Sequence, residues 1–444
     1  MAGLAQMLKQ KGFEVSGSDK ANSKILEMLK QSGIEVFLGH KAEQVVGADR
    51  VILSSAISPN NPEWLASKLI NIPILHRAEA LAELAKTKQK TVLILGSHGK
   101  TTTTGLIVSI LNAAGLNPSY AIGATYYASG LNACLDSGDV FVVEGDESDQ
   151  SFKYFQPDIL ILTNIDEDHL ETYDHDLEKL KTAYLNFIQT LSPDALVILN
   201  QDDFHCRSLI PKIKTRLKTY GYENADLIIS EIKIGPRSTS FEVDNAVFSV
   251  ALPGAHNAEN SAAALLVAQE LKIDLESQKK GLKDYRGASR RCEVHGESDF
   301  LGLELPFLLI EDYGHHPAEI TATLKALKQA YPERRLVLIF QPHRYTRTQA
   351  LLDSFAKALS LPDVLILLDI YAASEKPIEG VSSELLIKKI REIKSDNSYL
   401  AGLSNCLESL EKIVCEGDLV LIQGAGDVHC LVERLMTETR VAIF

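Results

Sequence analysis

Residues 96–104, which read GSHGKTTTT, combine the residue types of a phosphate-binding loop. Glycines let backbone N–H groups approach an anion, and the Lys100 ammonium can pair with the outer phosphates of a nucleotide. The hydroxyl of Thr101 can serve as a ligand of Mg²⁺. The pattern predicts a nucleotide site, and the alternative is an ordinary glycine-rich turn with a solvated lysine.

The segments on either side of this loop favour phosphate binding. An apolar run at 92–95 predicts a strand before the loop, and a helical pattern over 104–114, stopped by Gly115, follows it. The N-terminus of that helix adds a favourable dipole for an anion. The loop is shorter than the general GxxxxGK[ST] pattern, because Ile94 stands where the first glycine is expected.

Acidic residues follow two further apolar runs, where the metal ligands of a nucleotide site are expected. Glu144 closes the run 140–143 and can hold Mg²⁺ opposite Thr101, as an oxygen ligand for a hard cation. The next apolar run leads to Asp168 and His169, and His169 can ligate a metal or contact phosphate. The alternatives are a solvated acidic loop and a merely exposed histidine.

Polar residues at one predicted helix start and a later basic pair are candidates for nucleotide contacts. His256, Asn257 and Asn260 begin a helix, where an Asn either caps the helix or hydrogen-bonds a purine. The pair Arg290 and Arg291 is either a solvated surface pair or a clamp for phosphate or carboxylate, which the planar guanidinium suits.

A second basic group follows two strands predicted near the C-terminus. It contains His315, His316, His343, Arg344 and Arg347. A zinc site is not expected, because neither an HExxH pattern nor a cysteine accompanies the histidines. Arginines three residues apart beside imidazoles suit an anionic substrate such as a carboxylate, and the alternative is a solvated basic face.

Strands alternate with helices along the whole chain, which predicts α/β architecture with ligands at the carboxyl ends of parallel strands. The length of 444 residues favours two or three domains. We predict a Rossmann-like domain at 1–88, a central P-loop ATPase-like parallel-sheet domain at 89–293, and a Rossmann-like α/β domain at 294–444. Four C-terminal strands are predicted at 307–310, 336–340, 364–368 and 419–422.

The N-terminal region reads as short α/β units that begin inside a helix. A helix ends at Gly12, a strand is predicted at 13–17, and further strands at 34–37 and 50–54. A Rossmann-like domain normally opens with a strand and a glycine-rich loop. We expect this domain to be truncated, with that strand and loop missing before Met1, through either a start codon assigned too late or a different mode of ligand binding.

The composition excludes several classes of protein. A net charge of −14 argues against a nucleic-acid partner, which would require a basic surface. No apolar run is long enough to span a membrane, and we read no signal peptide, so we expect a cytoplasmic protein without membrane insertion. The six cysteines lack any CxxC pairing and are expected to be free thiols.

Nine strings spread over nearly the whole chain resemble the Mur ligase family, in family order. They are SGSD (16–19), SSAI (54–57), GSHGKTTTT (96–104), DESDQSF (146–152), TNIDEDHLETY (163–173), PGAHNAEN (253–260), DYGHHPAE (312–319), FQPHRYTRT (340–348) and GAGD (424–427). The strings DESDQSF, DYGHHP and QPHRYTRT resemble the alanine-adding type of the family and its close relatives. The short GxxGKT loop is the form that this family uses.

The resemblance implies a three-domain ligase with ATP and Mg²⁺ as cofactors and UDP-N-acetylmuramate and L-alanine as substrates. ATP would phosphorylate the lactoyl carboxylate, and the alanine amine would attack the acyl phosphate through a tetrahedral intermediate. A carboxylate is a poor acyl donor until phosphorylation turns one oxygen into a leaving group. We expect a monomer or a dimer.

The resemblance also implies roles for individual residues. Catalysis would rest on Lys100, His169 and Arg291. Mg²⁺ would be held by Thr101, Glu144 and His169. ATP would be bound by Gly96, Ser97, His98, Gly99, Lys100, Thr101, Thr102, His256, Asn257, Asn260 and Asp312. The UDP-sugar and the amino acid would be bound by Ser18, Asp19, Ser55, Tyr313, His315, His343, Arg344 and Arg347.

Two other functions remain open at this point. One is the recycling ligase of the same family, which attaches a murein tripeptide to the same sugar. The other is a non-catalytic nucleotide-binding protein, which the expected N-terminal truncation makes plausible. The strings DESDQSF and TNIDEDH favour addition of alanine.

Overall fold

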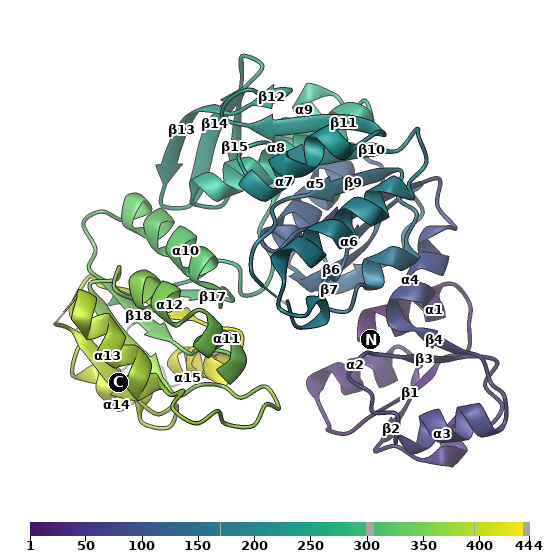
Figure 1. The fold of residues 1–444 in the computed structure, drawn as a ribbon, viewed down its shortest axis with the longest axis horizontal. Coiled ribbons are helices and arrows are strands. Elements are labelled where there is room, and N and C mark those ends of the chain that lie inside the picture. The colour runs from purple at the N-terminus through teal and green to yellow at the C-terminus, as the bar shows by residue number, and fades with distance from the viewer. Residues whose placement is uncertain (169, 299–305, 395, 438–444) are drawn as a thin grey trace, which may run out of the picture. The chain divides into compact units, whose positions relative to one another are not determined.

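The structure is a computed structural model that describes residues 1–168, 170–298, 306–394 and 396–437. The chain forms two compact units, whose elements are labelled in Figure 1. The first unit contains 1–230, 242–248 and 259–285, and the second contains 231–241, 249–258 and the chain from 286 onward. In the described part of the chain, no helix has the length and apolarity needed to cross a bilayer.

The N-terminal elements of the first unit form two separate parallel strand pairs, β1–β2 and β3–β4. Their bounds are α1 Ala2–Gln10, β1 Ser16–Asp19, α2 Lys24–Gln31, β2 Glu35–Leu38, β3 Val51–Leu53, α3 Pro62–Leu69, β4 Ile74–His76 and α4 Arg77–Ala85. The strand predicted at 13–17 is misplaced. Gly12 turns the chain at φ +97° and the Phe13 side chain is exposed, so pairing begins only at Ser16.

The central sheet of the first unit has eight strands in the order β12-β11-β10-β9-β5-β8-β6-β7. All neighbouring strands are parallel except β6 and β7. The strands are β5 Lys90–Leu95, β6 Ser119–Tyr126, β7 Leu131–Cys134, β8 Val140–Glu144, β9 Ile159–Leu162, β10 Leu196–Asn200, β11 Arg216–Gly221 and β12 Leu227–Ile228. The parallel central sheet predicted from the sequence is therefore confirmed, and the antiparallel hairpin at its edge was not predicted.

Helices cover this sheet because its central strands are apolar on both faces. The helices are α5 Lys100–Ala113, α6 Leu177–Gln189, α7 Phe204–Leu209, α8 Ala255–Glu270 and α9 Leu275–Asp284. A separate three-stranded sheet is formed by β13 Ser230–Gly235, β14 Ser238–Val243 and β15 Ala246–Val250. On one face, Leu93, Phe141 and Leu160 share a core with α4 and α6. α5 packs closely on α9, where a Cβ on Gly281 would lie 2.4 Å from Ile110 Cα.

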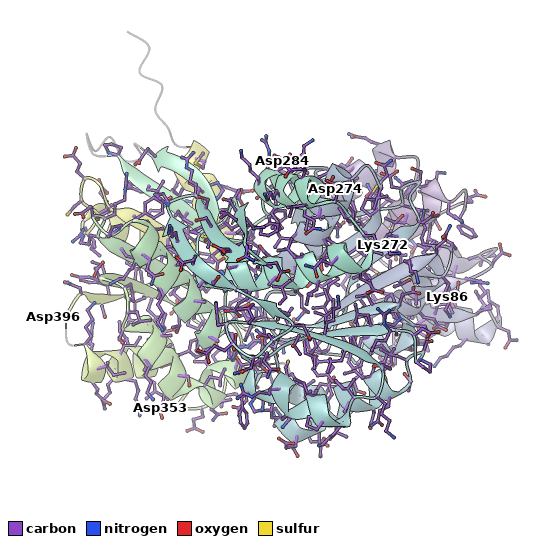
Figure 2. All side chains as sticks on the ribbon, turned by 90° about the horizontal axis from the view of Figure 1, so that it is seen from above. Lys86, Lys272, Asp274, Asp284, Asp353 and Asp396 are labelled. Carbon is purple, nitrogen blue, oxygen red and sulfur yellow. The ribbon has the colours of Figure 1, made fainter. Side chains whose placement is uncertain are left out.

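The turn between α8 and α9 is exposed and carries its own capping signals. Lys272 adopts a left-handed conformation at φ +57° just after α8 ends. Asp274 then caps α9, because its Oδ1 accepts a hydrogen bond from Ser277 N at 2.9 Å. Figure 2 labels Lys272 and Asp274 at this turn.

The second unit contains a six-stranded sheet in the order β16-β17-β21-β18-β19-β20, parallel except for the edge strand β16. Its elements are β16 Glu293–Ser298, β17 Phe307–Asp312, α10 Pro317–Ala330, β18 Leu336–Phe340, α11 Tyr345–Ala350, α12 Leu352–Leu359, β19 Val364–Leu368, α13 Ser383–Ile393, β20 Ser398–Ala401, α14 Cys406–Glu411, β21 Leu419–Gln423 and α15 Cys430–Thr437. The four predicted strands are confirmed, whereas the two edge strands were not predicted.

Alternating side chains divide this sheet into two cores. Leu309, Val337 and Ile366 point to a core shared with α14 and α15. Their chain neighbours Leu308 and Leu338 point to a second core, shared with α10, α12 and α13. Because successive strand residues face opposite sides, a continuous apolar run is what a sheet buried on both faces requires.

Candidate active site

Two glycines shape the phosphate-binding loop that joins β5 to α5. Gly96 has φ +127° and Gly99 has φ +81°, conformations that disfavour other residues. A Cβ on Gly96 would lie 2.1 Å from Thr163 Oγ1. A Cβ on Gly99 would lie 2.5 Å from Oδ1 of Asn260, which also accepts a hydrogen bond from Thr103. The loop is thus held too closely by its neighbours to accept a side chain at either position.

The helix after this loop begins earlier than predicted. α5 starts at Lys100, whereas the apolar pattern predicted a start at 104. Gly99 is the N-cap, so Lys100 to Thr103 form the first helical turn although they are not apolar in sequence. The first N–H groups of an α-helix have no intrahelical acceptor, so a helix start is a favourable place for an anion. Here the helical hydrogen-bond pattern begins with Thr103 N, which donates to Gly99 O.

The loop after β9 is hydrogen-bonded to the phosphate loop, and these contacts were not predicted from the sequence. Thr163 Oγ1 donates to His98 O at 2.6 Å, and Asn164 Oδ1 accepts from His98 N at 2.8 Å. The His98 ring contacts Asp166 Oδ2 at 2.8 Å. The only available signal was the position of Thr163 directly after a buried strand, where parallel strand ends gather ligand-binding loops.

Lys100 is held by acceptors of this chain. Its Nζ donates to Gly96 O at 2.5 Å, to Ser97 O at 3.2 Å and to Glu147 Oε1 at 2.9 Å. Burial lowers and the Glu147 carboxylate raises the pKa of Lys100, and the net direction is upward. Lys100 therefore stays a cation in this site.

Thr101 and Glu144 form an oxygen-rich pair beside the loop. Thr101 Oγ1 lies 3.0 Å from each carboxylate oxygen of Glu144, and Gly123 N donates to Glu144 Oε2 at 2.7 Å. Mg²⁺ prefers oxygen ligands such as a hydroxyl and a carboxylate, and these two groups lie side by side, so these residues fit the ion. Of the predicted pair Asp168 and His169, the Asp168 side chain is buried. His169 lies outside the described residues.

In the second unit, Asp312 is the centre of a hydrogen-bond network at the end of β17. Its carboxylate accepts from Cys292 N at 2.9 Å, Gly314 N at 2.9 Å and Gln423 Nε2 at 2.8 Å. Burial raises the pKa of Asp312, and the nearby Arg291 opposes that effect. The network ties the loop after β17 to the end of β21 and to the segment just before β16.

Three more of the predicted nucleotide-binding residues lie in the second unit, and each has neighbours of its own. They are His256, Asn257 and Arg291. Burial lowers the pKa of His256 to about 4, against the opposing effect of the Glu319 carboxylate. Asn257 Nδ2 donates to Pro253 O at 2.8 Å, which fastens the start of α8. Arg291 lies 3.8 Å from Glu319, whose Oε2 also accepts from the backbone of the histidine pair at 315–316.

Four aromatic rings form a continuous row across three loops of the second unit. Tyr313 contacts His315 at 5.3 Å between centroids, His315 contacts His343 at 5.6 Å, and His343 stacks on Tyr371 at 5.5 Å. Arg347 is buried and its Nη1 lies 3.2 Å from His343 Nδ1. The residues predicted to bind the amino acid are therefore brought together, and Tyr371 was not predicted among them.

Arg344 and Arg290 make contacts within the second unit that were not predicted from the sequence. Arg344, at φ +72°, is the N-cap of α11 and donates its backbone N–H to Tyr371 O. Arg290 donates to Gly424 O at 2.5 Å and pairs with Glu311 at 2.9 Å, so it is an internal link between loops. From the sequence Arg290 is either a solvated surface residue or part of an anion clamp, and the fold gives it these internal partners instead.

The residues predicted to bind the sugar nucleotide lie at the ends of the N-terminal strands. Ser18 Oγ donates to Glu63 Oε2 at 2.7 Å and contacts His40 Nδ1 at 2.9 Å. Asp19 Oδ1 accepts from Ala21 N, and Ser55 is exposed. Ser18 thus belongs to a polar group of three side chains, two of which were not predicted.

Comparison with known proteins covers nearly the whole chain. The Mur ligase family catalytic domain matches residues 1–89, the Mur ligase middle domain matches 94–268, and the Mur ligase glutamate ligase domain matches 290–426. The UDP-N-acetylmuramate–L-alanine ligase of Neisseria meningitidis serogroup A is 42% identical, over 97% of this chain and 93% of its own length. The enzyme of the same name from Nitrosomonas eutropha is 40% identical, over 96% and 92%.

Solved structures agree with these matches. The UDP-N-acetylmuramate-alanine ligase of Thermotoga maritima is 27% identical with a TM-score of 0.81, covering 98% of this chain and 95% of that one. A murein peptide ligase of Psychrobacter arcticus has the same fold, with a TM-score of 0.71 and 20% identity over 100% and 97%. This chain therefore belongs to the Mur ligase family.

Proposed function

We propose that this protein uses ATP to join L-alanine to the lactoyl carboxylate of UDP-N-acetylmuramate, a step of peptidoglycan precursor synthesis. The observation that carries the proposal is near full-length identity of about 40% to enzymes of that name, together with an intact phosphate loop. We retain the division into domains at 1–88, 89–293 and 294–444, which would bind the UDP-sugar, ATP and the amino acid.

The first chemical step would be phosphoryl transfer from ATP to the lactoyl carboxylate. Backbone N–H groups of the first turn of α5 would hold the phosphates, and Lys100 would stabilise the negative charge on the transferring group. Mg²⁺, when bound, neutralises phosphate charge, and Thr101 and Glu144 are the residues that would hold it. The family resemblance assigns a second ion to His169 and a phosphate contact to Arg291.

The second step would be attack of the alanine amine on the acyl phosphate. The tetrahedral intermediate would collapse with loss of phosphate and leave an amide. Arg347 and His343, in contact at 3.2 Å, would bind the alanine carboxylate, with Arg344, Tyr313 and His315 alongside. A guanidinium and an imidazole suit a carboxylate, because both donate charge-assisted hydrogen bonds.

The test is ADP release by the purified protein with each substrate omitted in turn. ADP is expected only when UDP-N-acetylmuramate and L-alanine are both present, and the new amide should appear by mass spectrometry. Equal ADP release without alanine would contradict the proposal. Supplying L-alanine and a murein tripeptide in parallel distinguishes addition of alanine from the recycling reaction, and ATP binding without any amide would indicate a non-catalytic protein.

A further inference from the structure

Glu147 is a buried carboxylate beside the phosphate loop for which the chemistry above has no use. It lies in the loop after β8, three residues beyond Glu144, and it is 2% exposed. Its carboxylate oxygen Oε1 accepts from Lys100 Nζ at 2.9 Å. A buried charge is costly unless it is paired, so this contact requires an explanation.

The lysine in this pair has no spare hydrogen. An ammonium carries three N–H donors, and Lys100 directs them at Gly96 O, Ser97 O and Glu147 Oε1. To reach the phosphates of a nucleotide, Lys100 must therefore give up at least one of these three acceptors. Glu147 is the one acceptor that carries a full charge, and it is the one that a polyphosphate would repel.

The backbone of the loop that carries Glu147 is held by several hydrogen bonds. Tyr173 Oη donates to Glu147 O at 2.7 Å, and Thr172 Oγ1 donates to Ser148 O. Asp146 Oδ1 also accepts from the backbone and the hydroxyl of Ser148, at 2.9 and 2.6 Å. Because the loop is braced on both sides of Glu147, the flexible lysine is the partner that moves.

We propose that Glu147 is a positioning residue that holds Lys100 in the nucleotide-free loop and releases it to the phosphates when ATP binds. The inference builds on the proposed function, since it concerns the same phosphate site. Part of the energy of ATP binding is then used to separate Lys100 from Glu147. A charge-neutral replacement that keeps the acceptor should reduce that cost and tighten nucleotide binding.

The test is the affinity of the full-length protein for ADP with Mg²⁺, measured by isothermal titration calorimetry. Glu147→Gln is expected to lower the Kd roughly fivefold, because the amide oxygen still accepts from the Lys100 ammonium but no longer carries the opposite charge that holds it away from the phosphates. Glu167→Gln, which removes an exposed carboxylate on the neighbouring loop, is the matched control and should leave the Kd unchanged. An unchanged or raised Kd for Glu147→Gln overturns the proposal, because a purely structural role predicts weaker binding.

A double-mutant cycle with Lys100→Ala shows whether Glu147 acts through the lysine. In the Lys100→Ala background, Glu147→Gln should improve ADP binding by a smaller factor than in the natural protein. An equal improvement in both backgrounds would mean direct repulsion of phosphate and would overturn the positioning role. Absence of ADP binding by the natural protein would instead overturn the proposed function, so the two failures are distinguishable. Thermal unfolding checks that each variant is folded.

Discussion

The hydroxyl of Thr101 lies 3.0 Å from both carboxylate oxygens of Glu144. Thr101 lies at the start of α5, and Glu144 is the last residue of β8. Neutralising the carboxylate should weaken Mg²⁺ binding, since a hard cation prefers charged oxygen ligands. For Glu144→Gln we expect the Mg²⁺ concentration for half-maximal activity to rise about tenfold or more.

The measurement is the rate of ADP formation against Mg²⁺ concentration at saturating substrates. Glu178→Gln, at an exposed position in α6, provides a control with the same change of charge. Identical Mg²⁺ dependence in Glu144→Gln and the natural protein would exclude Glu144 as a ligand.

Gly99 and Gly115 allow backbone strain to be separated from a steric clash. Both have positive φ, +81° and +72°, but a Cβ at Gly99 would meet Asn260 Oδ1 at 2.5 Å, whereas a Cβ at Gly115 meets nothing within 4 Å. Gly115→Ala should cost about 1 kcal/mol of stability and leave ATP binding unchanged. Gly99→Ala should lose stability and ATP binding together, which denaturant unfolding and calorimetry would reveal. Equal behaviour of the two variants would refute the close-contact argument.

Arg347 is expected to govern the Michaelis constant for L-alanine. Because it is buried and contacts His343 at 3.2 Å, it is placed to bind a carboxylate at the aromatic row. A hydrogen bond to a charged group is worth roughly 1.5–3 kcal/mol, so Arg347→Gln should raise KM for L-alanine about tenfold to hundredfold. ADP affinity should stay the same.

The control for this substitution is Arg237→Gln, at an exposed turn of the second unit. Steady-state rates at varied L-alanine, with ATP and the UDP-sugar saturating, provide the measurement. A loss in kcat with KM unchanged would assign Arg347 to a different role.

His256 should make the protein less stable in mild acid. Its pKa is lowered to about 4 by burial, below the value near 6.5 of an unfolded chain. Between these values the unfolded state binds a proton that the native state does not, so stability is present above pH 6.5 and is lost as the pH falls toward 4. The natural protein should lose about 2 kcal/mol more than His256→Gln between pH 7 and pH 5.

Urea unfolding at the two pH values tests this prediction. His175→Gln, which replaces an exposed histidine, serves as the comparison and should retain the pH dependence of the natural protein. If His256→Gln shows the same loss as the natural protein, the buried neutral imidazole is not the cause.

Local patterns in the sequence were sufficient to locate most strands and the loops that follow them in the chain. Apolar runs such as 159–162 and 336–340 coincide with β9 and β18, because a strand buried on both faces needs apolar residues throughout. The edge strands β16 and β20 escaped prediction, since a partly exposed strand lacks that continuous signal. The start of α5 was missed because glycine geometry, and not apolar spacing, begins that helix.

The partnerships in the site were decided by tertiary structure alone. GSHGKT predicts that Lys100 binds phosphate and that Thr101 binds a metal ion. No local pattern predicts that Glu147 accepts from Lys100 or that Asn260 packs on Gly99. The sequence likewise predicts Arg290 to be a surface residue or part of an anion clamp, and only the fold brings Gly424 and Glu311 to it. Sequence determines which residues can do chemistry, because side-chain type and local spacing are local properties. Which of them meet depends on strand order, and strand order is set by packing across the whole sheet.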